Sequence, residues 1–197
     1  MALRAIFGLV MLVGLGAAAP VAAQDLLSPQ PLAGIVDEVR IGLHAHNVDY
    51  AGLPFRFSEY DLSHIEDLSF DVLFTSPELD VFRWIGAPRP ELGATVSLGG
   101  KESLAHLGLT WQLKLFETPL YLEGTFGAAA HTGYNTGAPA GMKNFGCTIN
   151  FYERYGIGTA LGENATATLT YEHTSNNGAC EANDGLSNFG LRVGWKF

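Results

Sequence analysis

The sequence predicts an all-β protein, an eight-stranded antiparallel transmembrane β-barrel. Three observations support this fold. Apolar and polar residues alternate along segment after segment, so each segment forms a strand with one apolar and one polar face. Eight such segments occur, and their usual length of about 8 to 12 residues is enough to cross a bilayer when tilted. Aromatic residues also gather near the segment ends, as they do at the interfaces of membrane barrels.

The N-terminal residues predict a secretory signal peptide rather than part of the fold. Arg4 is followed by the apolar run 5–16 and by small residues at 21–23. We expect residues 1–23 to be cleaved and residues 24–197 to form one domain, the barrel. No later stretch reaches about 18 consecutive apolar residues, so no transmembrane helix is expected.

The charge of the chain argues against nucleic acid as a partner. The chain has 20 acidic and 11 basic residues, and removal of Arg4 leaves 10 basic residues and a formal charge of −10. A phosphate backbone would be repelled by this charge. Anionic lipid phosphates would need local basic groups or bridging cations.

The expected strands follow one another at short intervals. A long loop is expected at 46–67, a second at 132–143 and a turn at 156–163. The stretch 76–90 contains three prolines and is expected to be irregular, with a short helical turn. The alternating segments span residues 38–45, 70–75, 91–98, 106–115, 120–131, 144–152, 165–175 and 188–197.

Alternation alone does not say which face lies inside. A soluble lipocalin-like carrier would turn its apolar face inward, and a membrane barrel would turn it outward toward lipid. The membrane barrel is favoured because the chain ends on a strand with Phe197, and because the polar face carries charges of both signs that suit a small lumen. These charged residues are Glu38, Arg40, Glu123, Glu172, Arg192 and Lys196.

A histidine and a serine break the apolar face of the strand 165–175. With both barrel termini on the periplasmic side, this strand runs outward, so His173 and Ser175 lie on the lipid-facing surface near the outer headgroups. They are about 7 Å apart along the strand, and imidazole is the usual base that activates a serine. Spacing alone favours the alternative, two polar residues at headgroup level.

Only two cysteines occur, Cys147 and Cys180. An even number in an exported chain favours one disulfide, and two separate small apolar residues are the alternative. Cys147 is expected to begin a strand that descends from the outer rim, and Cys180 lies in the outer loop 176–185. A disulfide between them is therefore geometrically plausible.

The residues around the pair resemble the sequence signature of a known protein family. His173-Thr174-Ser175-Asn176, Gly178 and Asn183-Asp184-Gly185 precede a strand that ends the chain. This pattern resembles the lipid A 3-O-deacylase (PagL-like) family of outer-membrane barrels. The segments 89–93, 108–111 and 124–127 resemble the strands of that family, so the likeness covers most of the chain after residue 23.

The resemblance implies a bacterial outer-membrane esterase that removes the 3-O-linked acyl chain of lipid A in lipopolysaccharide, without a cofactor or a metal. It implies Ser175 as nucleophile and His173 as general base and acid. It also implies an oxyanion hole formed by the Gly178 amide and the Asn183 side chain.

One position departs from the family pattern. Ser187 stands where the family has the glutamate that orients the histidine, and loss of such an acid costs about 10⁴-fold in a serine protease. Asp184 or Glu181 could supply a carboxylate, or a hydroxyl or backbone carbonyl could orient the ring more weakly. The alternative function is a non-catalytic outer-membrane barrel, structural, lipid-binding or adhesive. A homodimer is left open.

Other candidate groups are weaker. His44 and His46 are two residues apart at a strand end, but the sequence shows no third ligand for a metal. The sequon at Asn164 would not normally be used in a bacterial barrel. Charged residues on the polar face, such as Glu123, Glu172 and Arg192, are expected to form an ion-pair network in the lumen.

Overall fold

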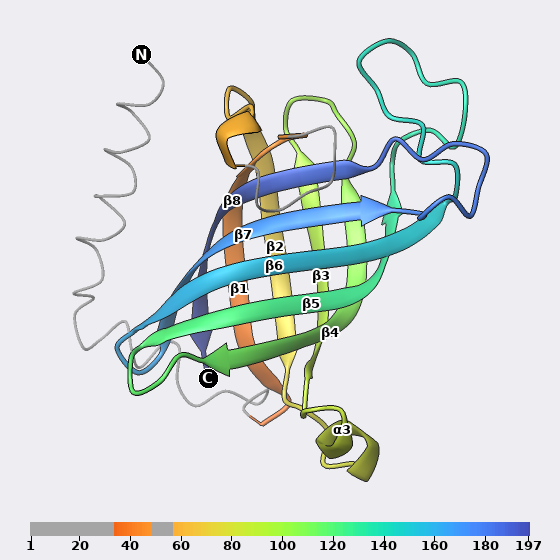
Figure 1. Cartoon of the computed structure of the whole chain (residues 1–197). Helices are drawn as coiled ribbons and strands as arrows, with labels where there is room; N and C mark the ends of the chain where they lie inside the picture. The colour runs from red at the N-terminus through yellow and green to blue at the C-terminus, as the bar shows by residue number, and fades with distance from the viewer. Residues whose placement is uncertain (1–33, 49–56) are drawn as a thin grey trace.

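The computed structural model describes residues 34–48 and 57–197. The expected signal peptide lies outside these residues. Within them, the chain forms a closed antiparallel barrel in which each strand pairs with the next and β1 pairs with β8 (Figure 1). This confirms the predicted fold class. The strands are β1 Val36–Ala45, β2 Ile65–Phe74, β3 Arg89–Ser97, β4 Leu104–Lys114, β5 Leu120–His131, β6 Ile149–Leu161, β7 Ala165–Ser175 and β8 Leu186–Lys196.

The two ends of the barrel differ in their connections. The C-terminus and the short turns 115–119 and 162–164 lie at one end, together with the segment 75–88. That segment contains the short helix α3, Asp80–Trp84, where the sequence predicts a helical turn. The opposite end, called the outer rim below, carries residues 46–48 and 57–64 and the loops 98–103, 132–148 and 176–185 (Figure 1).

No helix among residues 34–48 and 57–197 has the length and apolar character needed to cross a membrane.

The barrel is apolar outside and polar inside, so the predicted orientation is confirmed. Phe70 is 55% exposed and Leu107 is 62% exposed on the outside, whereas the largest fully buried side chains include Arg40, Arg154 and Arg192. A soluble protein would show the reverse. The outward-facing surface of the strands is called the outer wall below.

Ion pairs fill the lumen. Arg40 contacts Glu38 at 2.8 Å and Glu123 at 2.6 Å, and Arg192 contacts Glu123 at 2.7 Å. Glu123 and Arg192 thus belong to the predicted network. Glu172 instead accepts hydrogen bonds from hydroxyl groups, at 2.6 Å from Tyr152 and at 3.0 Å from Thr95. These contacts satisfy groups that would be costly to bury alone.

Strand β6 differs from the prediction at both ends. The predicted turn at 156–163 is wrong, because β6 continues to Leu161 and only residues 162–164 turn. Gly158 lies within the predicted turn, but in the structure it leaves room inside the barrel for the ring of Tyr121.

The predicted start of this strand is also wrong. Strand β6 begins at Ile149, not near residue 144, so Cys147 does not begin a strand. Gly146 has a φ of 77°, which breaks the extended backbone. Phe145 is fully buried in a cluster with Leu104, Ala129, Tyr152 and Leu186 at the outer end of the lumen.

Candidate active site

The candidate histidine and serine lie on the outer wall at the end of β7. Thr170, Glu172 and Thr174 alternate with them and are buried in the lumen. His173 and Ser175 point the other way and are half-buried. The pair therefore lies at the outer rim and faces outward from the barrel.

Ser187 contacts the ring of His173. The two residues are directly opposite each other across the β7–β8 pair, and His173 Nδ1 lies 2.9 Å from Ser187 Oγ. Tyr171 donates its phenolic hydrogen to the same Oγ at 2.8 Å, and Ser187 is only 2% exposed. When Nδ1–H donates to this hydroxyl, Nε2 carries the lone pair that can accept a proton.

Gly185 lies directly beside the pair. A Cβ added to this glycine would lie 3.3 Å from His173 Cε1 and 3.7 Å from Ser175 Cβ, so the imidazole and the serine border one small space. The φ of Gly185 is 61°, in the left-handed region that favours glycine. The glycine lets the outer loop pass close to the pair.

Asn176, immediately after Ser175, organises the loop 176–185 from a buried position. Its Nδ2 donates to the backbone oxygens of Phe145 and Ala182, both at 2.6 Å, and its Oδ1 accepts the Gly178 N–H at 2.8 Å. Its own N–H donates to Asn183 Oδ1 at 2.8 Å. The sequence placed Asn176 in the signature but assigned it no role.

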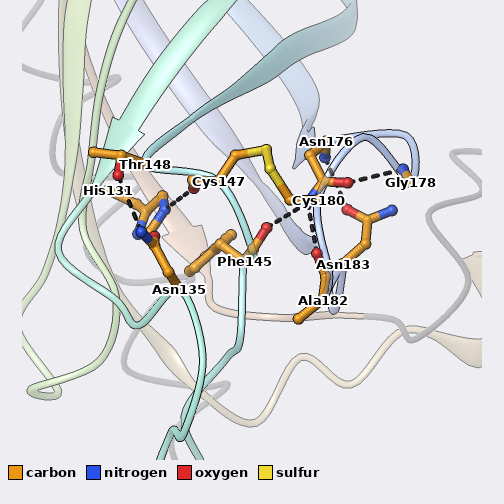
Figure 2. The surroundings of a disulfide bond; sticks show 10 residues. All are labelled: His131, Asn135, Phe145, Cys147, Thr148, Asn176, Gly178, Cys180, Ala182 and Asn183. Carbon is orange, nitrogen blue, oxygen red and sulfur yellow. Dashed lines mark hydrogen bonds between the residues drawn. A yellow bond between two sulfur atoms is a disulfide. The ribbon is translucent and has the colours of Figure 1, made fainter.

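These bonds determine whether the two expected oxyanion donors, the Gly178 N–H and the Asn183 side chain, already have a partner. The Gly178 N–H is bonded to Asn176, so it must leave that oxygen to bind an oxyanion. Asn183 uses Oδ1 toward Asn176, and its NH₂ group points to the other side (Figure 2). The side-chain amide is therefore the donor that needs less rearrangement.

A disulfide links the loop 176–185 to the loop 132–148. Cys147 and Cys180 are bonded, with Cα atoms 5.7 Å apart, as expected for the two rim cysteines (Figure 2). His131 contacts the Cys147 carbonyl oxygen at 2.7 Å. The loops 132–148 and 176–185 thus form one covalently linked unit beside the histidine–serine pair.

The two acids suggested as substitutes lie in this loop, but the side chain that contacts His173 Nδ1 is Ser187. Asp184 Oδ2 accepts the backbone N–H of Asn144 at 2.6 Å and its side-chain Nδ2–H at 3.3 Å. Glu181 is exposed. Of these three side chains, Ser187 is the one whose hydroxyl contacts Nδ1.

Aromatic rings from the loop 57–64 pack on the wall beside His173. Tyr60 stacks on Tyr171 with ring centroids 5.8 Å apart, and Tyr171 stacks on His173 at 6.4 Å. Phe189 lies 5.3 Å from Tyr60, and Phe57 lies 6.1 Å from Phe189. We call Phe57, Tyr60, Tyr171 and Phe189 the aromatic cluster; sequence periodicity placed Tyr171 and Phe189 on the apolar face but gave no partner from the loop.

Groups that could hold a metal lie inside the barrel, away from this face. In the described part of the chain, ligand atoms of Asp71, Glu91 and His106 lie within 4.8 Å of one another. Arg154 contacts both carboxylates, and Arg192 contacts Asp71 at 3.1 Å. Because guanidinium groups already balance these acids, the cluster fits a structural network better than a cation site.

The histidines considered for a metal are engaged separately. His44 Nε2 lies 3.3 Å from Thr170 Oγ1 in the lumen. His46 Nδ1 lies 2.8 Å from Asp67, and its Nε2 lies 3.3 Å from Glu102. Burial opposes the charged imidazole, but these two acids outweigh it and raise the pKa of His46 to about 9.

Comparisons with known proteins agree with this geometry. A family model described as lipid A 3-O-deacylase (PagL) matches residues 73–196. No curated protein matches the sequence significantly.

Several solved structures are similar. The crystal structure of the outer membrane enzyme PagL has a TM-score of 0.54 and 16% identity, and the match covers 81% of this chain and 99% of that one. The N-terminal β-barrel domain of Pseudomonas aeruginosa OprF has a TM-score of 0.49 and 12% identity, covering 82% and 97%. Yersinia pestis outer membrane protein Ail has a TM-score of 0.46 and 12% identity, covering 83% and 99%.

These comparisons give no support for a homodimer. The family model covers more than half of the chain, including the strands and loop that carry His173, Ser175 and Ser187. The chain therefore belongs to the lipid A 3-O-deacylase (PagL) family and is a β-barrel of the bacterial outer membrane.

Proposed function

We propose that this barrel is an esterase that hydrolyses the 3-O-linked acyl chain of lipid A, with Ser175 as nucleophile and His173 as general base and acid. The observation that carries the proposal is the position of His173, which borders Ser175 on the outer wall while its Nδ1 contacts Ser187. A serine, an imidazole and an orienting group are the parts that nucleophilic ester hydrolysis requires.

The first half of the reaction forms an acyl-enzyme. Ser175 Oγ attacks the ester carbonyl carbon as His173 Nε2 takes the hydroxyl proton. Negative charge then builds on the carbonyl oxygen, where the Asn183 NH₂ group and the released Gly178 N–H donate hydrogen bonds. When the carbon–oxygen bond breaks, the histidinium returns its proton to the sugar 3-oxygen, which leaves as a hydroxyl.

The second half releases the fatty acid. His173 Nε2 takes a proton from water, and the hydroxide formed attacks the acyl-enzyme carbonyl. The bond to Ser175 Oγ breaks, and Oγ recovers the proton from the histidinium. The steps use only side chains and backbone groups described above.

The wall beside the serine suits a substrate that arrives within the leaflet. Phe151 is directly opposite Ser175 across the β6–β7 pair and is 47% exposed. Its ring stacks on Phe126 at 6.2 Å, which extends the apolar surface to β5. An acyl chain lying along these rings would bring its ester bond to the outer rim.

Ser187 should make the enzyme slower than a relative with a glutamate there. A neutral hydroxyl can hold the ring and its tautomer, but it stabilises the histidinium less than a carboxylate does. The competing function is that of a non-catalytic barrel, and the experiment below distinguishes it from the esterase.

Mass spectrometry of lipid A from a Gram-negative host tests the proposal. Cells expressing the wild type should lose the 3-O-linked acyl chain, and cells expressing Ser175→Ala or His173→Ala should not. Ser63→Ala, in an exposed loop, is the matched control and should behave as the wild type. If the wild-type barrel is folded in the membrane but the acyl content of lipid A is unchanged, the esterase proposal fails and the non-catalytic function remains.

A further inference from the structure

A glutamate lies on the other flank of His173. Glu153 is directly opposite His173 across the β6–β7 pair, while Ser187 is opposite it across the β7–β8 pair. Residues paired in this way have Cβ atoms about 4.5–5.5 Å apart. His173 is thus bracketed by a carboxylate on β6 and a hydroxyl on β8.

The position of Glu153 is unusual for an acid. It alternates with the buried residues Tyr152 and Arg154, so it faces outward from the barrel. Among acids in the described strands, Asp37 and Glu66 also take outward positions, but both are second residues of their strands, at a barrel end. Glu153 lies further into the wall, where a charge on the lipid side is costly.

A neighbouring tyrosine holds this carboxylate on the wall. Tyr155 donates its phenolic hydrogen to Glu153 Oε2 at 3.0 Å. Tyr155 is itself paired with Tyr171, the ring that stacks on His173. The glutamate is therefore anchored within the same group of side chains as the histidine.

Resting on the function proposed above, we propose that Glu153 is a positioning residue of this active site. It supplies, from β6, the negative charge that Ser187 lacks on β8. The hydroxyl of Ser187 fixes the ring through Nδ1, and the Glu153 carboxylate stabilises the imidazolium that forms when His173 takes the serine proton. The two tasks of the family's single glutamate are thus divided between two strands.

The side chains that the described strands β7 and β8 place beside His173 are neutral. On β7 and β8 its neighbours are Tyr171, Ser175 and Ser187, which carry hydroxyls. The loop 57–64 brings Tyr60, one ring further away. In the outer loop, Asp184 is bonded to Asn144 and Glu181 is exposed.

The pH dependence of Glu153→Gln tests the proposal on purified, folded barrel with lipid A in detergent micelles. We expect kcat to fall about tenfold and the acidic limb of the profile to move down by about one pH unit, because an opposite charge at this range favours the charged imidazole. Glu163→Gln, at the turn 162–164 of the opposite end, is the matched control and should change neither quantity. Ser187→Glu added to Glu153→Gln should restore both.

A titration separates this inference from the proposed function. The NMR signals of His173 in labelled wild type and Glu153→Gln should show a higher pKa in the wild type even if the barrel hydrolyses nothing. If wild-type cells show no deacylation but the titration differs, the esterase fails and the pairing stands. If the titrations and pH profiles coincide, Glu153 has no such role and the inference is overturned.

Discussion

His173 Nδ1 lies 2.9 Å from Ser187 Oγ, across the last strand pair of the barrel. Because Nδ1 faces Ser187, Nε2 is the ring nitrogen that would take the proton of a neighbouring hydroxyl. It also leaves the histidine without a charged partner on β8, since Ser187 receives its other hydrogen bond from the neutral Tyr171. The activity of this barrel should therefore respond strongly to the residue at position 187.

Ser187→Glu should raise kcat on lipid A by about 10²-fold. The carboxylate would keep the Nδ1 contact and add the charge that stabilises histidinium, a part of the about 10⁴-fold effect known for such an acid. Ser187→Ala should lower kcat about tenfold, because the ring loses its orienting bond. Initial rates in micelles measure both; a folded Ser187→Glu variant slower than the wild type would contradict the assigned geometry.

Tyr60→Ala should raise KM by about fivefold and leave kcat nearly unchanged. Tyr60 stacks on Tyr171 and contacts Phe189, so its loss opens the aromatic cluster beside the site without removing a reacting group. Steady-state rates over a range of lipid A concentrations separate the two constants. Tyr134→Ala, in the loop 132–148, is the control, and an equal effect of both variants would argue against a role of the cluster in substrate binding.

The barrel could be predicted from the sequence because alternation is a local property. The polar faces that contain Arg40 and Arg192 and the apolar faces that contain Leu43 and Leu191 are both read from neighbouring residues. The predicted turn at 156–163 was wrong because a glycine there serves packing. Gly158 accommodates the ring of Tyr121 on the adjacent strand, a contact that no local pattern encodes.

The site was only partly predictable for a related reason. The signature located His173, Ser175 and Ser187, since it is continuous along the chain. Glu153 and Tyr60 were not identified, because strand pairing places Glu153 opposite the histidine and loop packing places Tyr60 on Tyr171. A cross-strand register, here Glu153 opposite His173, is fixed by the closed barrel rather than by either strand alone.

Replacement of both cysteines by serine should loosen the outer loops while the strands stay paired. The disulfide spans 33 residues, and closing such a loop contributes about 3 to 4 kcal/mol in the chain-entropy model. We expect protease cleavage within 132–148 or 176–185 and reduced deacylation, because Asn183 loses its fixed position. Wild-type protein treated with reductant should behave like the double variant. If the double variant resists protease fully, the hydrogen bonds of Asn176 are enough to hold the two loops without the disulfide.

Stability should fall as the pH rises through about 9, because His46 loses its proton there. Burial disfavours its charge, but Asp67 and Glu102 raise its pKa to about 9 from an ordinary value of 6.5. A raised pKa stabilises the folded state fully below pH 6.5, and this stabilisation, about 3 kcal/mol, is lost between pH 6.5 and 9. The midpoint of thermal unfolding in detergent, measured from pH 6 to 10, should drop in the wild type and vary much less in His46→Gln. If the unfolding midpoint changes with pH in the same way in both proteins, the charge of His46 does not stabilise the fold through Asp67 and Glu102.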